Sequence, residues 1–136
     1  MSDAPVRLMK SVPGLAATPG YSYAASSPDE LVFFSGQVPI DADGKIVGAG
    51  DFDAQMQKAF ANLRLALAEA GCSPETVLRT SYFIVGLDAE RLATFRRHRD
   101  AFFAPSARPA STLLGVAALF HPDCLIEVEV VAARRR

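Results

Sequence analysis

The sequence predicts an α+β fold in which two helices cover one face of a β-sheet. Apolar, β-branched and aromatic runs bounded by turn residues indicate strands, in the overall order β-β-β-α-β-α-β-β. Helices placed between the strands of one sheet usually pack on that sheet. At 136 residues, with no internal linker or obvious repeat, we expect one domain spanning residues 1–136.

Short strands separated by turns are expected before the first helix. Val6–Met9 and Tyr21–Ala25 are candidate strands, and Leu31–Gly36 is a bounded apolar run that fits a buried strand. A tight turn at residues 41–44 leads to a further candidate strand at Lys45–Val47.

The two helix-forming segments each begin at an aspartate that can cap the first turn. Asp51 opens the first helix, which ends at Gly71, and Asp88 opens the second, which ends near Phe103. In the first helix, apolar residues recur at steps of three and four, which predicts one buried side. The second helix has a basic polar side that carries Arg91, Arg96, Arg97, His98 and Arg99.

Three strands are expected around and after the second helix, at Leu78–Gly86, Ser111–Leu119 and Leu125–Ala132. In the last of them, the even-numbered positions are all apolar and should face the helices. The odd-numbered positions mix apolar residues with Glu127 and Glu129. A face of that mixed kind fits a subunit interface that holds a polar pocket.

Composition and charge exclude several classes of protein. The formal net charge is −1, so no strong attraction to a nucleic acid is expected, and the basic residues 134–136 fit a solvated tail. Cys72 and Cys124 do not form a metal-ligand set with the two distant histidines. The chain shows neither a signal-peptide pattern nor an apolar run of membrane-spanning length, so we expect a cytoplasmic protein with reduced thiols, no metal and no membrane partner.

No common catalytic motif is present, but three local features are candidates for binding or catalysis. Ser35 and Gly36 end an apolar strand, where a hydroxyl and free backbone N–H groups can receive an anion or a carbonyl. Glu127, if enclosed by its apolar neighbours, would have a raised pKa and could activate a water. Tyr21 can offer a hydroxyl to a pocket.

Each of these three features also fits a structural role. Ser35 and Gly36 can be a plain strand exit, Glu127 can be exposed or paired with an arginine of a neighbouring chain, and Tyr21 can be an edge residue. A Cys–His nucleophile pair from Cys124 and His121 is conceivable, but no orienting group accompanies it in the sequence.

Four stretches carry a specific combined pattern, and they read SGQVPID, DADGKIV, FDAQMQKAFANLRLALAEAGCSPETVLRTSYFIVGLD and IEVEVVA. Together they resemble the Rid family of reactive intermediate deaminases, also called the YjgF or endoribonuclease L-PSP family. The resemblance runs from about Pro19 to Ala133. It implies a chorismate-mutase-like α+β fold, assembled as a homotrimer with sites in clefts between subunits. It also implies hydrolysis of enamines and imines to a 2-oxo acid and ammonia, with no cofactor.

The resemblance also implies roles for individual residues. Tyr21 matches the tyrosine of the family's G-P-Y-S-Q segment, although the chain here reads PGYSYA. Ser35 and Gly36 match the serine and glycine at the family's pocket, and Glu127 matches the glutamate that holds the water.

One position departs from the family pattern. Active members carry P-A-R-S, in which the arginine binds the substrate carboxylate, whereas this chain has Ser111 at the arginine position. Arg108 lies three residues earlier and cannot be equated with it. Binding of 2-imino acids should therefore weaken by about 2–4 kcal/mol unless another group compensates. Arg96 aligns with a polar position at the family's pocket and is the candidate replacement, although it also fits a solvated helix face.

The sequence therefore predicts a Rid-like hydrolase that acts on a small reactive enamine or imine other than the standard amino-acid-derived 2-imino acids. The alternative is a non-catalytic homotrimer that binds a small metabolite in the same cleft. Ribonuclease activity, credited to some members of the family, is a third hypothesis that the balanced charge does not favour.

Overall fold

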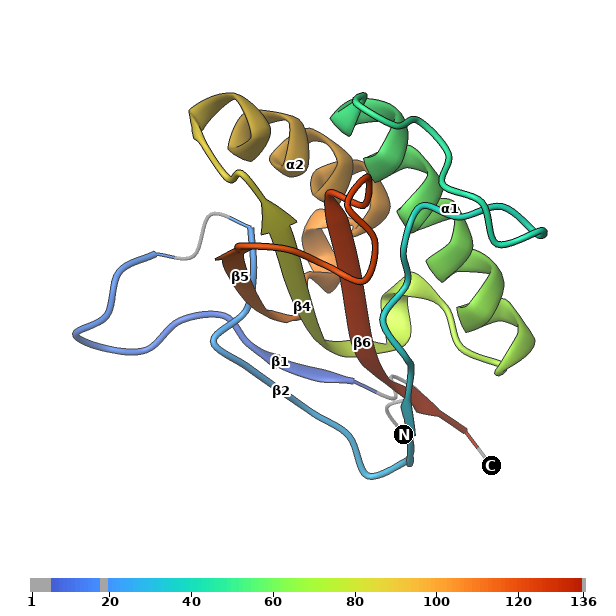
Figure 1. The fold of residues 1–136 in the computed structure, drawn as a ribbon. Coiled ribbons are helices and arrows are strands. Elements are labelled where there is room, and N and C mark those ends of the chain that lie inside the picture. The colour runs from blue at the N-terminus through green and yellow to red at the C-terminus, as the bar shows by residue number, and fades with distance from the viewer. Residues whose placement is uncertain (1–5, 18–19, 136) are drawn as a thin grey trace.

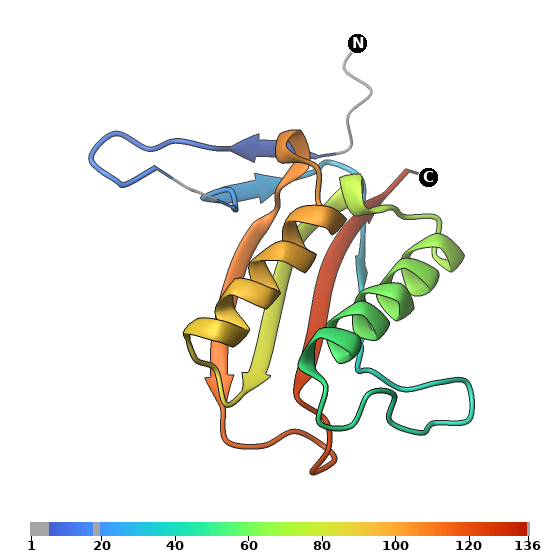
Figure 2. The same ribbon diagram turned by 90° about the horizontal axis from the view of Figure 1, so that it is seen from above.

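The computed structural model describes residues 6–17 and 20–135, which form a four-stranded mixed sheet with two helices on one face (Figures 1 and 2). The order of the strands across the sheet is β3 (Glu30–Phe33), β6 (Ile126–Arg134), β4 (Val77–Val85) and β5 (Ala110–Val116). β6 is antiparallel to both of its neighbours, whereas β4 and β5 are parallel. The parallel pair is joined by a helical crossover, which explains why a helix separates these two strands in the sequence.

The helices are α1 (Phe52–Glu69) and α2 (Ala89–Phe102), and both begin as the sequence predicts. The Asp51 side chain accepts a hydrogen bond from the Ala54 N–H at 3.0 Å, and the Asp88 side chain accepts one from the Arg91 N–H at 2.8 Å. Each carboxylate satisfies a backbone donor that the first helical turn leaves open. Gly71 follows the first helix with a φ of 74°, a left-handed conformation that glycine adopts without strain.

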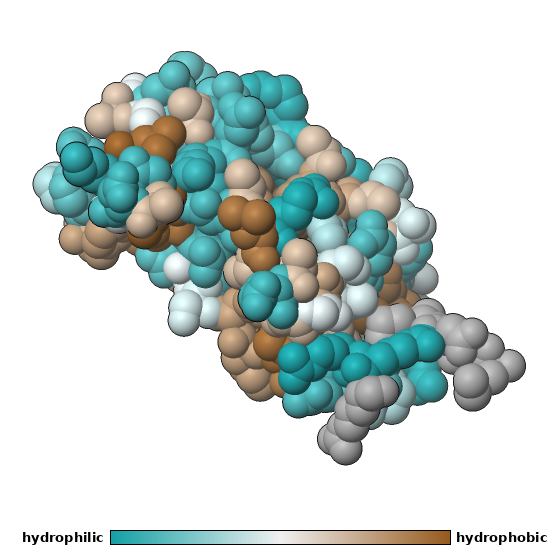
Figure 3. Space-filling view, turned by 90° about the vertical axis from the view of Figure 1, so that its right-hand side faces the viewer, coloured by the Kyte–Doolittle hydropathy of each residue, from teal (hydrophilic) through white to brown (hydrophobic). Residues whose placement is uncertain are grey.

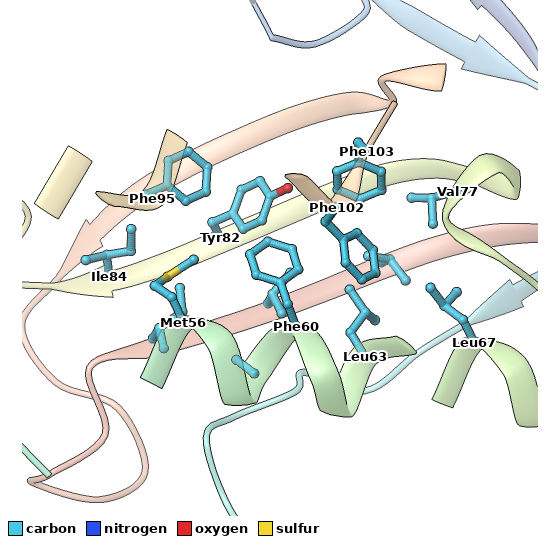
Figure 4. Close-up of a cluster of buried hydrophobic side chains, with 14 of the residues drawn as sticks. Met56, Phe60, Leu63, Leu67, Val77, Tyr82, Ile84, Phe95, Phe102 and Phe103 are labelled. Carbon is cyan, nitrogen blue, oxygen red and sulfur yellow. The ribbon is translucent and has the colours of Figure 1, made fainter. Parts of the chain in front are cut away.

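The core lies between the helices and the sheet (Figure 4). Tyr82 of β4 packs against Phe95 of α2, with ring centroids 4.5 Å apart, and Phe60 of α1 packs against Phe102 of α2 at 4.8 Å. The even-numbered residues of β6 from Ile126 to Ala132 are buried beneath the helices, as their uniform apolar character predicts. Because these positions carry no polar side chain, one face of β6 can be enclosed without the cost of burying an unsatisfied group.

The first two strands form a separate two-stranded sheet, β1 (Arg7–Met9) with β2 (Ala24–Ser26), instead of joining the main sheet. The predicted strand at Lys45–Val47 is wrong, because only one isolated bridge links Ile46 to Ile40. Two turns of 3₁₀ helix, Pro74–Thr76 and Pro105–Ala107, precede β4 and β5.

The structure also corrects the prediction that Leu31–Gly36 is a buried strand. β3 lies at an edge of the sheet, and Leu31 and Phe33 are 48% and 75% exposed. Their side chains lie on the face of the sheet that no helix covers, whereas Val32 packs against the core. Apolar composition alone does not distinguish a strand buried on both faces from an edge strand with one open face.

On the side turned to the viewer in Figure 3, apolar groups occur in small separate areas between hydrophilic ones. No helix in the described part of the chain is long and apolar enough to cross a lipid bilayer.

Candidate functional site

The predicted site residues lie on two different sides of the sheet. Glu127 of β6 pairs with Phe83 of β4, and Ser111 of β5 pairs with Thr80 of β4. Directly paired residues point to the same face of a sheet, and successive residues of a strand alternate between faces. Ser111 therefore shares the helix-covered side with Thr80, and Glu127 lies on the uncovered side. The six residues do not form one cluster within a single chain.

The first group is the Glu127 wall, which consists of Ser35, Gly36 and Glu127. A Cβ atom placed on Gly36 would lie only 2.1 Å from Glu127 Oε2, so the carboxyl group rests against the bare backbone of this glycine. The adjacent backbone is fixed by two hydrogen bonds: the Gln37 N–H donates to the Val128 carbonyl at 2.6 Å, and the Val128 N–H donates back to Gln37 at 2.9 Å. The close approach of Gly36 to Glu127 is thus built into the sheet.

Electrostatics on the Glu127 wall favour a carboxyl group that can exchange a proton. Burial raises the pKa of the Glu127 carboxyl, and the charge of nearby Glu129 raises it further. The N–H groups of Ser35 and Gly36 donate to no other described residue, although the amides of Phe34 and Gln37 on either side are both bonded to β6. Two open donors therefore lie close to a carboxyl group of raised pKa.

The second group lines the α2 cavity, a hollow of about 570 Å³ between α2 and β5. Three predicted residues meet there, Tyr21, Arg96 and Ser111. The remaining lining consists of Leu92, Phe95, Arg99, Asp100 and Leu113. A hollow of this size with an apolar floor and a few polar groups is typical of a small-molecule site.

Arg99 and Asp100 are lining residues that the sequence reasoning did not select. Arg99 follows Arg96 by three positions, so both lie on one side of α2. This spacing is the feature of the sequence that could have identified Arg99 as a further candidate. Arg99 Nε donates to Asp100 Oδ1 at 3.0 Å, and the guanidinium also lies over the Phe95 ring, 5.4 Å from its centroid. Arg96 makes no hydrogen bond or ion pair within residues 6–17 and 20–135.

Arg108 does not line the α2 cavity. Its guanidinium lies 3.5 Å from Asp100 Oδ1, and its carbonyl accepts a hydrogen bond from the Ser22 hydroxyl at 2.5 Å. The Ser22 N–H also donates to the Pro109 carbonyl at 2.9 Å. These contacts tie the segment that carries Tyr21 to the start of β5.

The conceivable Cys124–His121 pair does not form. The Cys124 thiol is buried and donates to the Ile126 carbonyl at 3.4 Å, while His121 Nδ1 accepts from the Asp123 N–H at 3.0 Å. Burial raises the pKa of the Cys124 thiol, which disfavours the nucleophilic thiolate. Within the described ranges, no group of three or more His, Cys, Asp or Glu side chains is arranged to hold a metal ion.

Comparison with known proteins shows which proteins this chain is similar to. The model of the endoribonuclease L-PSP family matches residues 12–134. A RutC family protein of Synechocystis is 30% identical over 109 residues, covering 79% of this chain and 82% of the relative. The 3-aminoacrylate deaminase RutC of Acinetobacter baylyi is 32% identical, covering 79% of this chain and 82% of the relative. Among solved structures, the Rid-family protein YyfB of Yersinia pestis superposes with a TM-score of 0.88 at 31% identity, over 95% of this chain and 98% of that one.

Proposed function

The chain belongs to the endoribonuclease L-PSP family, also called the Rid or YjgF family, and we propose that it hydrolyses a small enamine or imine. The observation that carries the proposal is the Glu127 carboxyl group, which rests against Gly36 with a raised pKa and beside two open N–H donors. A carboxyl group with a pKa nearer to neutrality is a better acid–base catalyst at physiological pH.

The proposed reaction consumes one water and releases one ammonia. An enamine substrate first becomes the imine, as a proton adds to the carbon β to nitrogen and the nitrogen gives up one N–H proton. The Glu127 carboxylate then accepts a proton from water as the water oxygen bonds to the C=N carbon, and the electron pair of the C=N π bond moves to nitrogen. The nitrogen takes up that proton, which gives a carbinolamine. Glu127 then takes the proton of the carbinolamine hydroxyl and passes it to the nitrogen, so that the C–N bond breaks, ammonia leaves and the oxygen forms the carbonyl. The N–H groups of Ser35 and Gly36 hold a polar group of the substrate during these steps.

We further propose that the complete site forms between copies of this chain, in a homotrimer. The position of Glu127 and Ser111 on opposite sides of the sheet supports this, because one chain alone offers the two groups in different directions. The uncovered face of the sheet carries exposed Leu31, Phe33 and Leu114, which are side chains that a neighbouring copy can bury.

The proposed substrate differs from the standard 2-imino acids because Ser111 replaces the charged fork of an arginine with one neutral hydroxyl. A charge-assisted hydrogen bond is roughly twice as strong as a neutral one. The relative from Acinetobacter baylyi, which is 32% identical to this chain, is named for 3-aminoacrylate, an acid whose nitrogen is on carbon 3 instead of carbon 2. The name of this relative makes an enamine of this type the first candidate substrate.

Two assays test the proposal. The first generates 2-aminoacrylate from serine with a dehydratase and follows pyruvate formation; the second follows ammonia release from 3-aminoacrylate generated in situ. We expect a larger acceleration of the second reaction by this protein, and loss of that acceleration in Glu127→Gln. Ser111→Arg should raise the rate on 2-aminoacrylate. If Glu127→Gln leaves every rate unchanged, the proposed role of the carboxyl group is wrong.

A second candidate is a non-catalytic protein that binds a small metabolite. The observation that favours it is the α2 cavity itself, where the charged lining groups are two arginines and one aspartate, while Glu127, the glutamate of raised pKa, lies on the other side of the sheet. This candidate predicts ligand binding in the cavity together with no acceleration of either hydrolysis.

A further inference from the structure

One buried side chain on the apolar side of α1 is polar. Gln55 is fully buried, and a buried amide costs free energy unless its groups are hydrogen-bonded. Its Nε2 donates to the Gly48 carbonyl at 3.1 Å and to the Asp123 carbonyl at 2.7 Å. Its Oε1 accepts from the Leu125 N–H at 2.8 Å. Because Leu125 lies just before β6, two residues ahead of Glu127, Gln55 anchors α1 to the start of this strand.

A second amide on α1 binds the chain on the other half of the Glu127 wall. Asn62 follows Gln55 by about two helical turns, so the two amides lie on the same side of the helix. Asn62 Nδ2 donates to the carbonyls of Val38 and Ile40, at 2.9 Å in each case. Val38 lies two residues after Gly36, so Asn62 holds the segment that leaves the Glu127 wall.

The position of this segment depends on contacts at both of its ends. Ser35 and Gly36 lie between two attachments to β6, one through the backbone of Phe34 and one through that of Gln37. After Gln37 the chain leaves β6 and meets the Asn62 amide on α1. This later contact limits rotation about the last attachment, and a group used in catalysis needs support of this kind from the residues around it.

We propose that Asn62 is a positioning residue for the hydrolysis. α1 is anchored to the start of β6 through Gln55. From that anchor, the Asn62 amide keeps Gly36 and the two open N–H groups beside the Glu127 carboxyl. Asn62 acts through the backbone of residues 36–40 and not on the substrate. This inference rests on the proposed function and adds to it a residue of α1, on the helix-covered side of the sheet.

Two neutral substitutions test this role without changing the charge of the protein. Asn62→Leu keeps the branched shape of the side chain and removes both donors, whereas Asn62→Ala removes most of the side chain. Both should lower kcat/KM for 3-aminoacrylate on the order of tenfold, because a displacement of about 1 Å at a catalytic group can cost up to about 100-fold. Asn62 is only half-buried, so both variants should fold, which thermal melts check. If Asn62→Leu keeps the kcat/KM of the parent, the shape of the side chain suffices and the proposal is wrong.

The titration of Glu127 separates positioning from stability. If Gly36 withdraws, water reaches the Glu127 carboxyl, and the pKa of that group falls toward its ordinary value. The titratable and charged groups on its side or near it are Glu129, Cys124 and Arg79, and the substitutions leave all three in place. The acidic limb of kcat/KM and the ¹³C titration of the Glu127 carboxyl should therefore both move to lower pH. A lower melting temperature with both curves unmoved would assign the amide a purely structural role and contradict the proposal.

A matched control comes from another amide on the same helix. Gln57 is exposed, and Gln57→Ala removes a neutral amide as Asn62→Ala does. It should leave kcat/KM within about twofold of the parent and the titration of Glu127 unchanged. Equal effects of Gln57→Ala and Asn62→Ala would indicate a general response of α1 and would overturn the inference.

The two measurements also distinguish failure of this inference from failure of the proposed function. If Glu127→Gln leaves hydrolysis unchanged but Asn62→Leu shifts the Glu127 titration, Asn62 does hold the wall in place and the catalytic role of Glu127 fails. If Glu127→Gln loses hydrolysis but Asn62→Leu matches the parent in rate and titration, the catalytic role stands and the positioning role fails.

Discussion

Two glycines in this protein each make room for one charged side chain, and they do so for opposite charges. Gly36 lies against the carboxyl group of Glu127, and Gly20 lies against the guanidinium of Arg99. In both cases the missing Cβ lets a charged group come within contact distance of the backbone. The Glu127 contact occurs on a β-strand in the sheet, whereas the Arg99 contact joins a helix to a loop.

The two contacts differ in rigidity, and this difference bears on their proposed roles. Glu127 belongs to the central strand β6, whose partners on both sides fix its position. Arg99 is held by its own side-chain contacts, and Gly20 belongs to a segment tied to the sheet through Ser22. A proton-transfer group needs closer positioning than a charge that attracts an anion, so the more rigid contact suits the proposed catalytic group.

The largest effect is expected from Gly36→Ala. The new methyl group would meet Glu127 Oε2 and force the carboxyl group to move. A displacement of about 1 Å at a catalytic group can cost on the order of 100-fold in rate, so we expect a fall in kcat/KM of that size. Gly36 does not have a left-handed φ, so alanine itself adds no backbone strain there. A thermal melt should therefore show little change, and unaltered kinetics in a folded variant would contradict the proposed contact.

The pH dependence should show a smaller effect of the same group. As a base, Glu127 must be ionised, so kcat/KM should fall as the pH drops through its raised pKa. Glu129→Gln removes one of the two causes of the elevation and should shift this acidic limb to lower pH. Folding is linked to the same proton: the raised pKa makes the ionised carboxyl destabilising above that pKa, so Glu127→Gln should raise the melting temperature slightly at neutral pH. pH–rate profiles and thermal melts measure both.

Gly20→Ala should have a moderate effect that is confined to the α2 cavity. The added methyl group would displace the Arg99 guanidinium from its contacts with Asp100 and the Phe95 ring. We therefore expect the KM for 3-aminoacrylate to rise about three- to tenfold, with hydrolysis of an uncharged imine substrate unchanged. Gly36→Ala should lower the rate, whereas Gly20→Ala should weaken binding. If Gly20→Ala instead lowers the rate and Gly36→Ala weakens binding, the proposed roles of the two glycines are wrong.

The smallest effect is expected from Asp53→Asn, which probes the outer surface between the two helices. Asp53 pairs with His98 at 2.7 Å and Arg97 at 2.5 Å, and these hydrogen bonds lower the pKa of its carboxyl group. The stabilisation is present at neutral pH and is lost as the pH falls through this lowered pKa. Because the pair is exposed, the substitution should lower the melting temperature only slightly and should leave both sites unaffected. A change in the KM for 3-aminoacrylate would show that α2 itself had moved.

Local sequence rules predicted the helices well because their causes act over short distances. Asp51 and Asp88 each satisfy a donor three residues away, and the apolar spacing that follows repeats within every turn. The same rules predicted a strand at Lys45–Val47, but the segment has no strand partner beyond a single bridge. A strand requires a neighbour that is distant in sequence, and propensity does not reveal whether that neighbour is present.

The sequence by itself determined the two capped helices, the buried side of β6, the resemblance to the Rid family and the identity of the candidate residues. Only the tertiary structure decided which of those residues meet. The register of β4 with its neighbours places Glu127 and Ser111 on opposite sides, and the packing of α2 brings Arg99 to Gly20, 79 positions earlier in the chain. Periodicity sets the face of each element, whereas strand register and helix packing depend on contacts between residues far apart in the sequence.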